Sequence, residues 1–230
     1  MHTMIKKFKI IPFLPLLVIL LGWTAQARAD GFPVKDLPSE GKALVDFVPK
    51  GWTVEDQAKG DLNGDGVADI AAVLVQGKPD GGRSEAGDEL QRAVIVLLGS
   101  DKDKFIRAGT NSKFLSCKGC GGIKEGAGIG IKKGVLVVDQ MSGSREFANE
   151  TLRFRYDPGT QRFVLIGRDV ETGDGARGTG TTVSSNYLTG RKITEPYRYD
   201  KTGERKITTS TKTEECPVKT PFMEDAEPEN

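Results

Sequence analysis

Apolar residues run almost without interruption through two short segments, residues 67–75 and 93–98. Runs of this kind are typical of β-strands covered on both faces, because neither face is left for polar side chains. Residues 76–88, between them, are rich in Gly, Asp, Lys and Ser, which predicts a long surface loop. A third apolar segment, residues 135–138, predicts another strand.

The clearest local element is a hairpin. Leu152, Phe154 and Tyr156 alternate with arginines, and a second apolar segment follows at residues 163–166. Asp-Pro-Gly-Thr at residues 157–160 separates the two segments. Proline presets the backbone angle of a turn's second position, and glycine tolerates a positive φ at the third. We therefore expect the two strands to pair.

The C-terminal part of the chain is more polar. Thr-rich segments at residues 181–184, 192–199 and 205–211 predict strands that bury one face or lie at a sheet edge. A turn is expected at residues 200–203. Residues 217–230 combine acidic side chains with prolines, which predicts a disordered acidic tail.

One short N-terminal helix is predicted within residues 38–47. Ser39 is a possible N-cap, and Ala43, Leu44 and Phe47 follow at helical spacing. The other elements are sequential strands joined by short turns, which predicts an all-β fold, mainly an antiparallel meander. The meander is expected to form a sandwich or an incomplete propeller-like arrangement. A complete propeller is not expected, because no loop-bearing unit repeats along the chain.

The first 29 residues resemble a secretory signal peptide. Three lysines precede an apolar run at residues 10–21, and small residues follow up to Ala29. A retained membrane anchor is the alternative, but the run is shorter than the roughly 20 residues that a bilayer needs and contains Pro12 and Pro15. We expect one β-rich domain at residues 30–216, periplasmic or secreted, with no stable membrane span after signal cleavage.

The net charge and the histidine content limit the classes of function that the chain can have. Removing residues 1–29 takes away four of the 33 basic residues and none of the 32 acidic ones, so the mature chain has a net charge of about −3 and no indication of nucleic-acid binding. The single histidine, His2, leaves with the signal peptide. This excludes Ser-His-Asp and Cys-His mechanisms and the usual histidine-based catalytic zinc site. Enzymatic activity therefore stays uncertain and is less expected than binding.

An acidic loop at residues 61–69 predicts a metal site. Side-chain oxygens recur at Asp61, Asn63, Asp65 and Asp69, and the carbonyl of Val67 can add a neutral ligand. Three carboxylates, an amide and a carbonyl suit a hard cation with six to eight oxygen ligands. This set favours Ca²⁺ over Mg²⁺, which requires a stricter octahedron. The alternative is a polar turn that binds nothing.

The loop departs from an EF-hand but resembles another calcium loop. Its twelfth residue is Ala72, where an EF-hand has a bidentate glutamate, and an apolar strand follows instead of a helix. Gly64 and Gly66 permit a tight winding. Over residues 58–75, the pattern Asp-x-Asn-x-Asp-Gly-x-x-Asp resembles the loop of FG-GAP or VCBS-type repeats. The resemblance implies a structural calcium ion at the start of a strand.

Three cysteines leave the disulfide pairing open. In an oxidising compartment, one disulfide and one free thiol are expected among Cys117, Cys120 and Cys216, with the local pair slightly favoured. A thiol-disulfide exchange motif is the alternative, but it is weakened because such motifs gain a low thiol pKa from a helix N-terminus. The surrounding glycines, at positions 119, 121, 122, 126, 128 and 130, predict a loop.

Several features together resemble a group of exported bacterial proteins of unassigned function. They are the leader, the single calcium-type loop, the Cys-x-x-Cys-Gly-Gly turn, the hairpin and the segment at residues 186–192. The resemblance supports export and β architecture and implies no activity. The preferred hypothesis is a non-enzymatic binding module for a protein or glycan. The alternatives are a carboxylate-based polysaccharide hydrolase using Asp80, Asp88 or Glu89 and a thiol oxidoreductase.

Overall fold

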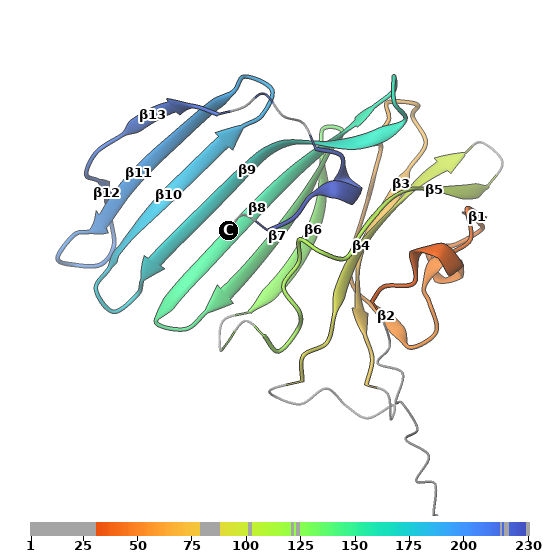
Figure 1. The fold of residues 1–230 in the computed structure, drawn as a ribbon, viewed down its shortest axis with the longest axis horizontal. Helices are drawn as coiled ribbons and strands as arrows, with labels where there is room; N and C mark the ends of the chain where they lie inside the picture. Colours follow the sequence, from red (N-terminus) through yellow and green to blue (C-terminus); the bar gives the residue numbers. More distant parts are fainter. Residues whose placement is uncertain are drawn as a thin grey trace, which may run out of the picture. The chain divides into compact units, whose positions relative to one another are not determined.

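The structure is a computed structural model, which describes residues 31–78, 88–100, 103–120, 122, 125–216, 218 and 221–228 (Figure 1). All described residues belong to one compact unit, which lies within Gly31–Asn230. The predicted signal peptide lies outside the described residues. The domain limits proposed from the sequence therefore stay predictions.

The all-β prediction is confirmed. The described residues form two sheets, and their helical segments are three short 3₁₀ helices: η1 (Val34–Asp36), η2 (Leu44–Phe47) and η3 (Met223–Asp225). The first sheet has the strand order β1-β5-β4-β3-β2. Its strands are β1 (Glu40–Gly41), β2 (Trp52–Gly60), β3 (Asp69–Gln76), β4 (Arg92–Ser100) and β5 (Lys104–Asn111).

The second sheet has eight strands in the order β12-β11-β10-β9-β8-β7-β6, and β13 also pairs with β11. Its strands are β6 (Gly126–Lys132), β7 (Val135–Gly143), β8 (Glu146–Asp157), β9 (Arg162–Asp174), β10 (Thr179–Asn186), β11 (Arg191–Tyr199), β12 (Lys206–Thr208) and β13 (Lys212–Glu215). Every pair of strands among the described residues is antiparallel, and successive strands are mostly neighbours, as a meander requires.

Two apolar clusters cover the two faces of β3 and β4. Ala71 and Val73 face a cluster shared with Phe154 and other side chains of the second sheet. Ile70 and Leu74 face a second cluster that contains Phe47 of η2. Since alternate residues of a strand point to opposite faces, only a continuous apolar run fills both clusters. The two sheets therefore share a core on one face of β3 and β4.

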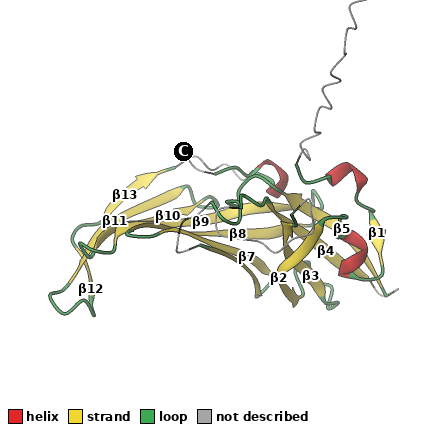
Figure 2. Cartoon of the chain, turned by 90° about the horizontal axis from the view of Figure 1, so that it is seen from below, coloured by secondary structure: helices red, strands yellow, loops and turns green. Residues whose placement is uncertain are grey.

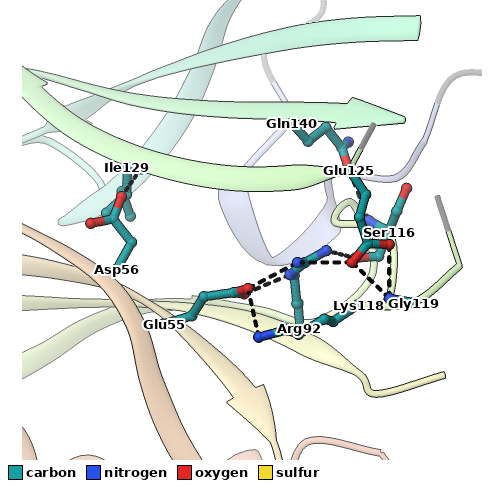
Figure 3. A network of polar contacts seen from close by, with 9 residues as sticks. All are labelled: Glu55, Asp56, Arg92, Ser116, Lys118, Gly119, Glu125, Ile129 and Gln140. Carbon is teal, nitrogen blue, oxygen red and sulfur yellow. Dashed lines mark hydrogen bonds and ion pairs between the residues drawn. The ribbon is translucent and has the colours of Figure 1, made fainter. Parts of the chain in front are cut away.

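A β-bulge brings the edges of the two sheets together. The register of β2 against β3 shifts between Val54 and Asp56. The backbone N–H of Ile129 on β6 donates to Oδ2 of Asp56 at 2.9 Å (Figure 3). An N–H on the edge strand of the second sheet is thereby satisfied by a carboxylate from the edge strand of the first.

The N-terminal helix is shorter than predicted and begins later. Within residues 38–47 the chain first forms the two-residue strand β1 and then the 3₁₀ helix η2. Ser39 does not cap a helix, because η2 begins after Ala43. The carbonyl oxygen of Ser39 instead accepts from the N–H of Arg107 on β5 at 2.9 Å. Asp46 satisfies the free amides instead, with its carboxylate accepting from Lys42 N and Ala43 N. Pairing with β5 therefore replaces the first helical turn.

Two local predictions need correction. The glycine cluster at residues 126–130 was predicted to be a loop, but it lies in β6; glycine also adopts extended angles, and Gly126 and Gly128 do not have a positive φ. The hairpin of β8 and β9 is confirmed, with Asp157 opposite Arg162. The positive φ in its turn, 56°, occurs at Gln161 and not at the glycine.

The prediction of a disordered C-terminal tail is wrong for residues 221–228. Met223 and Ala226 are buried in the shared core. The side-chain amide of Asn111 donates to the carbonyl oxygens of both residues, at 2.6 and 2.9 Å. The N–H of Leu165 also donates to the carbonyl of Pro221. Two buried apolar side chains and the side-chain amide of Asn111 therefore hold this otherwise acidic segment in place.

Candidate metal loop, cysteine loop and cavity

The acidic loop connects β2 to β3 and is wound tightly around Asp61. Gly64 and Gly66 both have φ of 82°, a conformation that glycine adopts without steric cost. The N–H of Gly64 donates to Oδ1 of Asp61 at 2.7 Å, and the N–H of Gly66 donates to its Oδ2 at 3.0 Å. These hydrogen bonds, the first from Gly64, lower the pKa of Asp61. The winding therefore favours a charged carboxylate inside the loop.

Asn63 and Asp65 continue the winding. The amide nitrogen of Asn63 donates to Oδ2 of Asp65 at 2.9 Å, and the N–H of Asp65 donates back to Oδ1 of Asn63. The N–H of Val67 donates to Oδ1 of Asp65 at 2.7 Å. The side-chain oxygens of this part of the loop are thus held by loop amides instead of extending away from the backbone.

Asp69 ties the loop to the first sheet. Its side chain is fully buried, with Oδ2 accepting from the N–H of Leu62 at 2.7 Å and Oδ1 from the N–H of Gly99 at 2.8 Å. Burial raises the pKa of Asp69, and the nearby carboxylates of Asp65 and Asp61 raise it further. Three negative charges therefore act on one another at the start of β3.

The donor chemistry suits a hard cation, while the geometry is that of an amide-bonded loop. Each carboxylate oxygen has a second lone pair beyond the one used by an amide, so Asp61, Asp65 and Asp69 keep coordinating capacity. Among the described residues, however, no three His, Cys, Asp or Glu side chains are arranged so that they could hold a metal ion. Calcium binding by Asp61, Asn63, Asp65, Val67 and Asp69 stays a prediction.

The cysteines pair locally, as favoured from the sequence. Cys117 and Cys120 form a disulfide with their Cα atoms 5.4 Å apart, and Cys216 is a free thiol. Lys118, between the paired cysteines, exchanges two backbone hydrogen bonds with Leu90, of 2.7 and 2.9 Å. These bonds hold the disulfide loop against the chain just before β4.

Arg92 links the cysteine loop to Glu55 on β2 (Figure 3). Its side chain is 3 % exposed and donates to both carboxylate oxygens of Glu55, at 2.6 and 2.9 Å, and to the carbonyl of Ser116 at 3.2 Å. Burial raises the pKa of Glu55, but the hydrogen bonds and charges of Arg92 and Lys118 outweigh it and leave the pKa below its usual value. The network is a paired structural anchor without the features of a nucleophile and its base.

A cavity of about 530 Å³, which we call the tail cavity, lies on the face of the second sheet that carries the shared core. It is lined by Phe114, Leu115, Ser116, Gln140, Ser142, Ala148, Glu150, Arg168, Val170, Thr172, Val183, Lys192 and Pro228. Its residues come from the segment after β5, from five strands of the second sheet and from the C-terminal segment. Sequence reasoning missed this site, because its residues are spread over more than one hundred positions and share no motif.

Two charged side chains of the tail cavity, Arg168 and Glu150, pair with each other. Arg168, which is 6 % exposed, forms an ion pair with Glu150 and donates to the carbonyl of Glu227 at 3.2 Å. Gln140 donates to Glu150 and to the carbonyl of Phe114, and its own oxygen accepts from the N–H of Ser116. These contacts fix the wall where the C-terminal segment and the segment after β5 meet the sheet.

The acidic residues considered for hydrolysis are not assembled into a site. Asp80 lies outside the described residues. Asp88 forms an ion pair with Lys78 at 2.9 Å, and Glu89 is exposed. Neither Asp88 nor Glu89 lines the tail cavity. The structure therefore adds no support to a pair of catalytic carboxylates at these positions.

Comparisons with protein-family models, with curated proteins and with solved structures find no match to this chain. In the described part of the chain, no helix has the length and apolar character needed to cross a membrane. Function therefore has to be argued from the sites themselves.

Proposed function

We propose that the protein is a secreted or periplasmic β-domain in which a structural calcium ion stabilises the 61–69 loop. In this proposal the domain is a non-enzymatic binding module for a protein or glycan partner. The observation that carries the calcium part is the loop itself, with Asp61 wound among its amides and Asp69 buried against β4. The resemblance to FG-GAP and VCBS-type loops supports the same assignment.

In this proposal the residues of the loop have different roles in holding the ion. Calcium would supply positive charge where Asp61, Asp65 and Asp69 repel one another. Gly64 and Gly66, both with φ of 82°, allow the tight turn in which Asn63 and Asp65 hydrogen-bond to each other. Asp69 links the loop through Gly99 to β4, so that an ordered loop stabilises the shared core. This is a stabilising role and involves no reaction.

The test is a melting experiment with and without calcium. Calcium at one hundred times its Kd is expected to stabilise the folded protein by about 2.7 kcal/mol relative to a sample in EDTA, because it binds only the folded state. Isothermal titration calorimetry should show binding at one site. An Asp61→Asn variant is expected to lose most of the calcium-dependent shift.

Asp157→Asn is the matched control. Asp157 also accepts hydrogen bonds within a turn, from Gly159 N and Thr160 Oγ1, but it lies outside the acidic loop. Its substitution should leave the calcium-dependent shift unchanged. Identical melting curves in calcium and EDTA, together with no heat of binding, would show that the loop is a polar turn without metal.

A further inference from the structure

The tail cavity has the size and walls of a small-molecule site. Its volume of about 530 Å³ lies within the range typical of ligand pockets. Strands β7 to β11 supply one side, while Phe114 and Leu115 on one flank and Pro228 on another add residues from distant parts of the chain. The first sheet and the C-terminal segment lie over only part of the second sheet, and strands β10 to β13 extend beyond the first sheet (Figures 1 and 2).

Much of the cavity lining is apolar. Val170 on β9 and Val183 on β10 are directly opposite each other, and Ala148 on β8 lies one row away, opposite Thr172. Phe114 and Leu115 add two buried apolar side chains. A ligand that places an apolar body here replaces water against these side chains, which is the favourable part of binding.

The unbalanced charge of the lining is positive. Arg168 and Glu150 neutralise each other through their ion pair. Lys192 on β11 is half-buried, and within the described residues it forms no ion pair shorter than 4 Å. Its cross-strand neighbour Glu214 pairs with Lys212 at 2.7 Å and lies on the exposed strand β13 outside the cavity lining, although its charge and that of Lys192 attract each other. The hydroxyls of Ser142 and Thr172 add hydrogen-bonding groups.

We propose that the tail cavity binds a small organic monoanion, such as a carboxylate with a hydrocarbon body, with the anionic group at Lys192 and the apolar body against Val170 and Val183. This inference rests on the proposed role as a binding module and gives that module a ligand class. It requires no calcium at the cavity and no chemical step.

The experiment uses 8-anilinonaphthalene-1-sulfonate, an apolar fluorophore with one negative charge, as the reporter. The full mature chain is titrated with it, and octanoate, octanol and octylamine then compete for the site. The three competitors share one hydrocarbon body and differ in charge. Octanoate is expected to displace the reporter at a concentration about tenfold lower than octanol, because a hydrogen-bonded charge adds to apolar contact. Octylamine should compete least.

Two kinds of variant locate the site. Lys192→Gln is expected to raise the Kd of octanoate about tenfold and to leave that of octanol within about twofold. Lys132→Gln is the matched control, because Lys132 lies at the exposed end of β6, outside the cavity lining. Ala148→Phe fills the cavity and should abolish competition by octanoate and octanol alike. If it does not fold, Val183→Phe fills the same space from another strand.

Two outcomes would overturn the assignment. One is equal displacement by octanoate, octanol and octylamine; the other is octanoate affinity that is unchanged in a folded Lys192→Gln or cavity-filled variant. Each titration is run in calcium and in EDTA. Calcium binding without octanoate binding would remove the ligand assignment alone, and octanoate binding without calcium binding would remove the metal assignment alone.

Discussion

Strands β3 and β4 of the first sheet and strands β10 to β13 of the second are all paired antiparallel, but the two groups are stabilised differently. In β4, the residues from Ala93 to Leu97 have no exposed surface, and apolar clusters lie on both faces. In β10, by contrast, most residues are partly exposed, and in β13 all four are exposed. Figure 2 shows these last strands extending beyond the first sheet.

Polar cross-strand pairs take the place of apolar burial in the second region. Ser184 donates to Asp169 at 2.6 Å, and Lys206 donates to Glu171 at 2.8 Å. The ammonium of Lys206 also lies 3.8 Å from the centre of the Tyr197 ring. Burial, followed by the hydrogen bond to Glu171, raises the pKa of Tyr197. One antiparallel topology therefore accommodates two balances of apolar burial and polar pairing.

The largest expected effect is the difference in the free energy of unfolding lost when each of two isoleucines is replaced by alanine. Ile95 on β4 is fully buried, and Ile193 on β11 is partly exposed. Ile95→Ala is expected to lower the free energy of unfolding by about 3 kcal/mol, because it removes buried methyl groups and leaves a cavity. Ile193→Ala should cost less than about 1 kcal/mol. Urea denaturation measures both, and similar losses would contradict the distinction between the two regions.

The second contrast is between the stability lost on replacing Arg92 and that lost on replacing Arg153. Arg92→Ala leaves the largely buried carboxylate of Glu55 without its bidentate partner, so we expect a loss of roughly 3 kcal/mol in urea denaturation. Arg153 pairs with Asp169 at 2.7 Å, but both side chains are more than 30 % exposed. Arg153→Ala should therefore cost less than about 1 kcal/mol. If the Arg92→Met and Glu55→Gln double variant is no more stable than Arg92→Ala, desolvation of Glu55 is not the cause.

The smallest effect is a titration at the end of β9, where Asp174 is opposite Thr179 of β10. The guanidinium of Arg145 donates to Asp174 at 2.8 Å and, with the amides of Arg177 and Ala176, holds the pKa of Asp174 at about 2. In Arg145→Gln, NMR should show this pKa returning toward 3.8. A depressed pKa contributes stability above its unfolded value and loses it as the pH falls toward 2. The stability difference between the two proteins should therefore shrink between pH 5 and pH 2.

The local sequence pattern predicted many of the strands but not the distant segments that they contact. The buried strands β3 and β4 and the hairpin of β8 and β9 followed from apolar runs and turn residues. Strand β6 was missed, because glycines at alternate positions remove the apolar signal while leaving the backbone free to extend. The ordered tail was missed because its two buried side chains, Met223 and Ala226, are surrounded by acidic residues and prolines.

The sequence by itself determined the buried strands β3 and β4, the hairpin of β8 and β9 and the position of the acidic turn between β2 and β3, because these depend on neighbours a few residues apart. Only the tertiary structure decided that Arg92 pairs with Glu55, 37 positions away, and that Asp69 is buried against Gly99. It also brought Lys192, Val183 and Pro228 to one cavity. Such contacts depend on how the sheets and the C-terminal segment pack, and sheet packing is set by the whole set of buried side chains at once.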